Sequence, residues 1–197
     1  TNISEDHLNI HKTLDNYIEC KCQLFRQVSD NGYSILNSMD VNYERILHCS
    51  KGTILTYGMN ESDTLFIKDY KEQDNKMKIT FRYNLKDYTV LSPLLGEFNV
   101  FNLAPAILTC LAKGISIEEV LKRVESLHQI EGRLEILPFT NKYIIMLDYA
   151  HTTNGIKSIL DTFSDYDNII VVTGCAGGRE KTKRRDIGKL IMDKSDI

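Results

Sequence analysis

The chain has 197 residues, of which 42% are apolar and 26% are charged, and its formal net charge at neutral pH is −3. This length can hold one large domain or two small ones around a real core. The nearly balanced charge argues against a nucleic-acid partner, and no apolar run is long enough to span a bilayer. No signal-peptide pattern opens these residues, so we expect a cytoplasmic protein without a membrane partner.

The cysteines support the same compartment. There are five of them, an odd number, and their spacings match no zinc or disulfide framework. We expect all five to be reduced thiols, as in a cytosolic protein: Cys20, Cys22, Cys49, Cys110 and Cys175.

The first predicted helix covers roughly residues 14–28 and carries an unusual lysine. A helical stripe joins four apolar residues and one lysine: Leu14, Ile18, Lys21, Phe25 and Val28. The pattern therefore predicts that Lys21 turns toward a buried face. Such a lysine usually extends to solvent or pairs with an acid, but a lowered pKa or a covalent change that removes its charge is the alternative. A carbamate, for example, would be an oxygen donor suited to Mg²⁺.

Residues 52–92 change to short alternating apolar runs separated by polar links, which predicts an antiparallel meander. Two helices should follow. The first covers about 99–112 and ends at Gly114, with Pro105 in its opening turn or at a bend. The second begins with a capping box made by Ser116 and Glu119. Its apolar stripe consists of Ile117, Val120, Leu121, Val124 and Leu127.

After residue 131 the pattern becomes strand, helix, strand, loop and helix. Strands are predicted over 143–147 and 168–172, and helices over about 155–163 and 184–194. Continuous β-branched runs that alternate with helices are typical of a parallel sheet covered on both faces. The chain is therefore predicted to be an α/β protein, with a domain boundary near residues 131–133.

Two segments lie where open parallel sheets bind ligands, beyond the carboxyl ends of strands. Residues 148–155, "DYAHTTNG", offer a carboxylate, an imidazole and hydroxyls, and residues 173–185 offer three glycines followed by basic side chains. Either segment could equally be an ordinary polar turn or a solvated helix start. Asn99 and Asn102 stand three apart at a helix start, where they could cap the helix or read an adenine edge.

Five collinear stretches resemble the Mur ligase family, in particular its UDP-N-acetylmuramoyl-tripeptide synthetase branch. They are "TNISEDHLNIHKTLDNYIECKCQLF", "LLGEFNVFNLAPAI", "EGRLEI", "LDYAHTTNGI" and "GCAGGREKTKRRDIGKL". The resemblance implies that residues 1–131 are the rear part of a central ATPase domain, with helices and an antiparallel meander. It implies that residues 132–197 begin a Rossmann-like, parallel-sheet C-terminal ligase domain.

The resemblance also implies roles for individual residues. Lys21 matches the family's carbamylated lysine and His7 a histidine that binds Mg²⁺ beside it. On this view Lys21 can point inward because carbamylation has made it an anion. Seven positions match residues near ATP: Asn99 and Asn102 at the adenine, Arg133 at a domain hinge, Asp148 near the ribose, His151 near the phosphates, and Arg179 and Lys183 in a glycine-basic loop. His151 is counted with Lys21 as catalytic.

The implied reaction is ATP-dependent amide formation between a UDP-N-acetylmuramoyl-dipeptide and a free amino acid, through an acyl phosphate. No P-loop motif occurs in these residues. We expect that motif upstream of Thr1 and the motif that selects the amino acid downstream of Ile197, so that the piece alone is inactive. Two alternatives stay open: a folylpolyglutamate- or cyanophycin-type ligase, which shares the scaffold, and a non-catalytic nucleotide-binding homologue, which residues that depart from the branch's pattern keep open. These residues are Asn9, Thr153, Asn154, Gly178 and Arg185.

Overall fold

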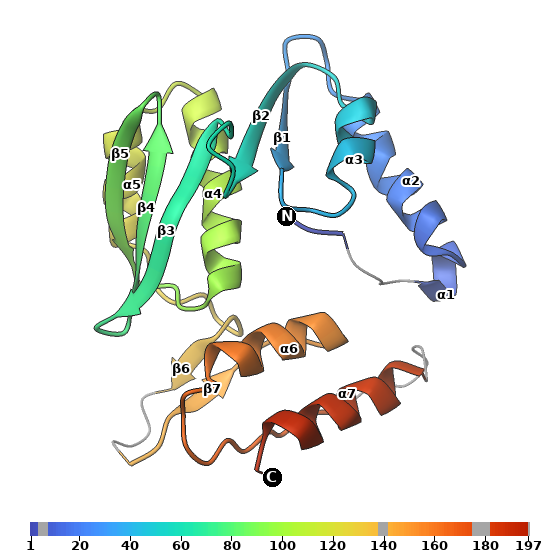
Figure 1. Ribbon diagram of the computed structural model, residues 1–197, viewed down its shortest axis with the longest axis vertical. Helices are drawn as coiled ribbons and strands as arrows, with labels where there is room; N and C mark the ends of the chain where they lie inside the picture. The colour runs from blue at the N-terminus through green and yellow to red at the C-terminus, as the bar shows by residue number, and fades with distance from the viewer. Residues whose placement is uncertain (4–7, 138–141, 175–181, 197) are drawn as a thin grey trace. The chain divides into compact units, whose positions relative to one another are not determined.

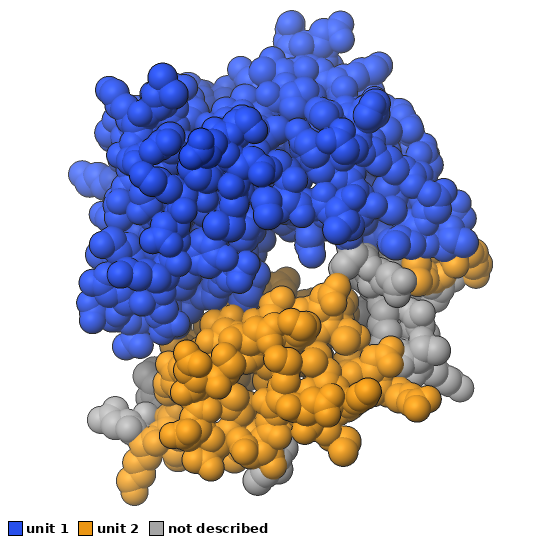
Figure 2. Space-filling model, in the orientation of Figure 1, with its two compact units in different colours: residues 1–5, 13–128 blue, residues 6–12, 129–197 orange. Residues whose placement is uncertain are grey.

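The computed structural model describes residues 1–3, 8–137, 142–174 and 182–196, with the side chains of residues 9, 182 and 183 excepted. The chain divides into two compact units, one formed by residues 1–5 and 13–128 and the other by residues 6–12 and 129–197. Figure 1 labels the elements of both units, and Figure 2 colours each unit separately. No helix in the described part of the chain is long and apolar enough to cross a membrane.

The first unit is built on a five-stranded sheet in the order β1-β2-β3-β4-β5. The strands are β1 (Tyr33–Asn37), β2 (Thr53–Gly58), β3 (Leu65–Gln73), β4 (Lys76–Tyr83) and β5 (Lys86–Ser92). The predicted antiparallel meander is confirmed for β3, β4 and β5. It is wrong for β2, which runs parallel to both β1 and β3. Helix α3 (Tyr43–Cys49) accounts for the β1–β2 pairing, because a helical crossover returns the chain in the same direction. β2 and β3 pair through Tyr57 with Leu65 and Gly58 with Phe66, where β2 ends and β3 begins.

Helices pack on both sides of the parallel strands (Figure 1). On one side, α3 and α2 (Leu14–Arg26) contact each other, and a buried cluster joins them to β1. This cluster consists of Ile18, Cys22, Leu36 and Ile46. On the other side, α4 (Glu97–Ala112) contacts β1, β2 and β3, while α5 (Ile117–Glu125) contacts β5. Alternate residues of β4, namely Met77, Ile79 and Phe81, are buried in the core, as expected for a strand with one face covered.

Helix α5 begins and packs as the sequence predicts. The Ser116 hydroxyl accepts a hydrogen bond from the Glu119 amide at 3.3 Å, which caps the helix. The first four residues of the predicted stripe are buried, and the fifth, Leu127, lies beyond the helix and is 39% exposed. Local spacing alone therefore predicts this helix.

Helix α4 begins at Glu97, two residues earlier than expected. Pro105 consequently lies inside the helix and not in its opening turn. The helix is followed by Gly114, whose φ of +83° is a conformation that favours glycine and stops the helix. The predicted C-terminal end is therefore confirmed, although the start is not.

The second unit contains α1 (Leu8–His11), β6 (Glu135–Leu137), β7 (Ile145–Leu147), α6 (Thr153–Thr162) and α7 (Thr182–Lys194). β6 and β7 form an antiparallel pair. Helices α6 and α7 pack against each other through a buried cluster of Ile156, Leu160 and Ile187. The mixed α/β class predicted from the sequence is confirmed.

Residues 168–172, predicted as a second strand, are not assigned to a strand among the described residues. Their burial still alternates, because Ile169 and Val171 pack on the α6–α7 cluster while Val172 is 95% exposed. The backbone of Ile169 is bonded to Asp196 instead: its amide donates to the Asp196 carboxylate at 2.7 Å and its carbonyl accepts from the Asp196 amide at 2.9 Å. The parallel pairing expected for this unit is therefore not formed within the described ranges.

Candidate functional site

The loop that follows β7 is held in place by Asp148. One oxygen of this carboxylate accepts the amide of Leu134 at 2.9 Å, and the other accepts the amide of Ala150 at 2.6 Å. The first bond ties the loop to the segment of Gly132 and Leu134, both of which have positive φ angles, +65° and +49°. Asp148 thereby shapes two stretches of backbone at once. A carboxylate suits this position because it accepts two hydrogen bonds without having to donate one.

Three predicted site residues meet on this framework. The Arg133 guanidinium lies over the ring of Tyr149, 4.9 Å from its centre. The same ring makes an edge contact with His151, at 5.2 Å between centroids. The His151 Nδ1 atom is 3.1 Å from the carbonyl oxygen of Tyr149. Because a carbonyl only accepts, Nδ1 carries the hydrogen in this contact, and Nε2 is the ring nitrogen left for a ligand. The structure therefore brings Arg133, Asp148 and His151 together.

Helix α6 begins immediately after this loop. The Thr152 hydroxyl accepts a hydrogen bond from the Gly155 amide at 3.1 Å, which caps the helix and fixes the end of the loop. The other predicted phosphate residues belong to the basic stretch before and within α7. Arg179 lies outside the described residues, and for Lys183 only the backbone, within α7, is described.

Lys21 lies on α2, but its predicted inward orientation is wrong. Its side chain is exposed, with Nζ over the ring of Tyr17 at 5.1 Å from the ring centre. The buried position of the stripe belongs to its neighbour Cys22, which lies four residues after Ile18. Positions 21 and 22 both fit a helical stripe, and packing against β1 and α3 selects the smaller, apolar side chain. His7, the predicted partner of Lys21, lies outside the described residues.

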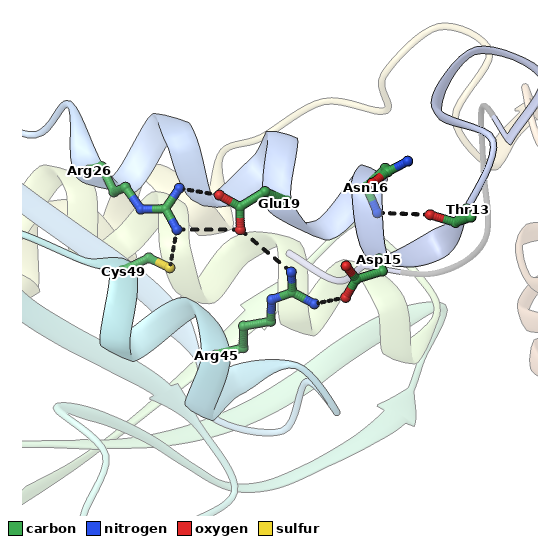
Figure 3. A network of polar contacts seen from close by, with 7 residues as sticks. All are labelled: Thr13, Asp15, Asn16, Glu19, Arg26, Arg45 and Cys49. Atoms are coloured by element: carbon green, nitrogen blue, oxygen red, sulfur yellow. Dashed lines mark hydrogen bonds and ion pairs between the residues drawn. The ribbon is translucent and has the colours of Figure 1, made fainter.

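A charged network beside Lys21 was not predicted. Arg45 of α3 binds Asp15 and Glu19 of α2, and Arg26 also binds Glu19 and lies 3.3 Å from the Cys49 sulfur (Figure 3). Hydrogen bonds from Arg26 and then Arg45 lower the pKa of Glu19. Residues two apart on a helix do not face each other, so Lys21 lies outside this network. In the sequence, the signal for this network was the spacing of three residues: Asp15 and Glu19 stand four apart, and Arg26 follows Glu19 by seven.

The two asparagines of α4 have different environments. Asn99 is buried, its Nδ2 donates to the Leu95 carbonyl at 2.7 Å, and its Oδ1 accepts from Asn102 Nδ2 at 3.4 Å. Asn99 therefore ties the first turn of the helix to Leu95, but it does not cap the helix: the N-cap is Gly96 and no side chain accepts a hydrogen bond there. Asn102 is exposed and is the better placed of the two to bind a ligand. None of the described contacts joins either residue to Lys21.

The donors needed for Mg²⁺ are only partly available in the described residues. These contain no group of three or more His, Cys, Asp or Glu side chains placed to hold a metal ion. The Lys21 ammonium offers no lone pair, whereas a carbamate on the same nitrogen would offer the oxygen ligands that Mg²⁺ prefers. Lys21 therefore fits such a site only after carbamylation.

Two families of domains match the chain. Residues 1–110 match the Mur ligase middle domain, and residues 132–195 match the Mur ligase glutamate ligase domain. Together they cover both compact units.

The curated relatives include two ligases of known name. A UDP-N-acetylmuramoyl-L-alanyl-D-glutamate--L-lysine ligase from Staphylococcus aureus (strain MW2) is 31% identical, over 96% of this chain and 40% of its own length. A UDP-N-acetylmuramoyl-L-alanyl-D-glutamate--2,6-diaminopimelate ligase from Fusobacterium nucleatum is 33% identical, over 100% of this chain and 41% of its own length. The chain thus spans about two fifths of the length of the curated relatives that it matches.

Solved structures agree on the fold. MurF from Acinetobacter baumannii superposes with a TM-score of 0.85 at 22% identity, covering 100% of this chain and 43% of that one. An FPGS complex with AMPPCP and folate superposes with a TM-score of 0.79 at 15% identity, covering 99% of this chain and 48% of that one. At these identities the likeness concerns the fold alone. The two domain matches, together with the collinear sequence stretches and this fold, establish that the chain belongs to the Mur ligase family.

Proposed function

We propose that the full-length protein is a cytoplasmic, ATP-dependent amide ligase of peptidoglycan precursor synthesis. It would join an amino acid to a UDP-N-acetylmuramoyl-dipeptide. The observation that carries the proposal is the meeting of Arg133, Asp148 and His151 on one loop framework. The names of the relatives support the substrate class. In this proposal residues 1–131 belong to the ATPase domain and residues 132–197 to the C-terminal ligase domain.

The proposed chemistry has two steps. A carboxylate oxygen of the acceptor attacks the γ-phosphorus of ATP, and ADP leaves. The amine of the incoming amino acid then attacks the acyl carbon, loses a proton, and expels phosphate with the former carboxylate oxygen. Both steps gather negative charge, so the site must supply cations and hold the reactants in line.

The described residues can meet part of this demand. Arg133 is exposed, and no acceptor for its N–H donors occurs within the described contacts, which suits it to phosphate oxygens. His151 has Nε2 available for a phosphate, and Asp148 fixes the backbone that carries Arg133 and His151. Asn102 is the proposed adenine contact. Arg179 and Lys183 are proposed as further phosphate contacts. Mg²⁺, when bound, would neutralise phosphate charge, with His7 and a carbamylated Lys21 as its proposed ligands.

The proposal is tested with the full-length protein, ATP, Mg²⁺, UDP-N-acetylmuramoyl-L-alanyl-D-glutamate and single amino acids. We expect one amino acid to yield phosphate and a product of the correct mass. Lys21→Ala should lower kcat by about 100-fold or more, since it removes a group needed for charge stabilisation, and added acetate should restore part of the loss. Lys51→Ala, an exposed lysine outside the site, is the control and should not change kcat. Normal turnover by Lys21→Ala without added carboxylate would contradict the assigned role.

The likeness to FPGS makes a folate acceptor the competing substrate class. The same assay with a reduced folate and glutamate decides between them. Turnover of the folate alone would replace the proposed substrate. Tight nucleotide binding without turnover of either acceptor would favour a non-catalytic homologue.

A further inference from the structure

Tyr149 lies in the stretch of residues 148–155, but the predicted site residues do not include it and the proposed mechanism gives it no role. Its side chain is 59% exposed, yet its ring contacts both Arg133 and His151. The two defined contacts, and not the exposure itself, distinguish Tyr149 from an ordinary surface aromatic residue.

The backbone of Tyr149 is held firmly on both sides. The preceding residue, Asp148, bonds the amide of the following residue, Ala150, at 2.6 Å, which closes a tight turn around Tyr149. The Tyr149 carbonyl is itself the partner of His151 Nδ1. The fixed backbone sets the direction of the Tyr149 Cα–Cβ bond, and the contacts of the ring with Arg133 and His151 then define where the ring lies.

The Tyr149 ring limits the positions of Arg133 and His151 but leaves their hydrogen-bonding atoms available. The guanidinium over the ring is attracted to the negative face of the π-system, which provides no lone pair, so the N–H donors of Arg133 stay available. The edge contact with His151 is not a hydrogen bond, and the one described polar contact of this imidazole uses Nδ1 and not Nε2. One side chain can therefore hold a phosphate-binding arginine and an imidazole in a fixed relation before any ligand arrives.

We propose that Tyr149 is a positioning residue that preorganises Arg133 and His151 for the phosphates of a bound nucleotide. The inference rests on the proposed function, because it assumes that this loop meets ATP. Preorganisation lowers the entropy lost when a ligand orders flexible side chains, so its removal weakens binding even though Tyr149 does not itself bind phosphate.

The test measures binding of AMPPCP to the full-length protein and the KM for ATP. Tyr149→Leu removes the ring and should weaken AMPPCP binding by about three- to tenfold, the combined strength of one cation–π and one edge-on contact. Tyr149→Phe keeps the ring and should bind like the parent protein. Tyr166→Leu is the matched control, because Tyr166 is an exposed tyrosine of the same unit whose ring contacts only Phe163 among the described aromatic pairs.

A double-mutant cycle separates positioning from a general structural effect. If Tyr149 acts through Arg133, then Tyr149→Leu should cost much less affinity in an Arg133→Met background than in the parent protein. Equal costs in both backgrounds, or a loss shared by Tyr149→Phe or Tyr166→Leu, would overturn the inference while nucleotide binding by the parent protein still supports the proposed function. If the parent protein binds no AMPPCP, the proposed function fails first and the inference falls with it.

Discussion

The amide of Leu134 donates a hydrogen bond to Asp148, 2.9 Å away and fourteen residues further along the chain. This bond joins the segment that carries Arg133 to the loop that carries Tyr149 and His151. The arrangement of the candidate site therefore depends on the Asp148 carboxylate.

Removal of the Asp148 carboxylate should loosen the backbone around Leu134 and Ala150. Asp148→Ala leaves the amides of Leu134 and Ala150 without their acceptor, a loss of about 1–3 kcal/mol for each buried donor that is not rescued by water. Hydrogen exchange of the Leu134 amide should therefore accelerate. Asp165→Ala, at an exposed position of the same unit, is the control. Unchanged exchange at Leu134 in Asp148→Ala would show that the bond does not hold the segment.

The network around Glu19 should contribute little and should depend on salt. Arg45→Met removes two ion pairs whose side chains are 36–74% exposed, so it should destabilise the protein only slightly. Glu19→Gln should cost more, because this carboxylate faces both Arg26 and Arg45. Unfolding in urea at about 0.1 and 1 M NaCl measures both effects, and each should shrink at high salt. Glu72→Gln, which changes an exposed acid on β3, is the reference. If Arg45→Met, Glu19→Gln and Glu72→Gln all depend equally on salt, the ion pairs around Glu19 do not contribute to stability.

Asp87 should make the first unit sensitive to acid. Hydrogen bonds from Arg82 and Lys68 lower the pKa of this carboxyl in the folded protein. A lowered folded-state pKa stabilises the fold above the unfolded value, about 4, and the contribution disappears as the pH falls through the folded value. The stability difference between the parent protein and Asp87→Asn should thus be full at neutral pH and shrink below about pH 4. Asp69→Asn serves as the control, and a difference that stays constant down to pH 2 would be inconsistent with this pairing.

Phe81 should dominate the core of the first unit. It is fully buried in β4, and Phe81→Ala should cost about 3–5 kcal/mol through lost burial and the cavity that remains. Leu85→Ala, in the turn before β5 at 95% exposure, should change stability by no more than about 0.5 kcal/mol. Hydrogen exchange of the β4 amides compares the two variants; similar exchange would contradict the described packing.

Features fixed by neighbouring residues could be predicted from the sequence. The cap and apolar stripe of α5 were predicted correctly because Ser116 and Glu119 interact within a single turn. The strands β3, β4 and β5 were predictable for the same reason, since short links join antiparallel neighbours. The roles of Arg133, Asp148 and His151 near one nucleotide were implied by the resemblance to Mur ligases, and not by local pattern.

Features decided by distant partners could not be predicted. The helical period allows either Lys21 or Cys22 to face inward, and only the packing of α2 on α3 and β1 decides between them. Ile169 bonds to Asp196, 27 residues away, and no local pattern indicates this. The direction of the Tyr149 ring depends on a turn closed by its neighbours, so the sequence showed an aromatic residue in a loop and nothing of its contacts.

The acyl-phosphate route is the centre of the proposal, and an isotope experiment tests it most directly. The full-length protein is supplied with a UDP-N-acetylmuramoyl-dipeptide whose terminal carboxylate carries ¹⁸O, together with ATP and the accepted amino acid. Mass spectrometry of the released phosphate should find one ¹⁸O atom in each molecule, because the carboxylate oxygen leaves with the phosphorus. Unlabelled phosphate, or AMP and pyrophosphate in its place, would contradict the account.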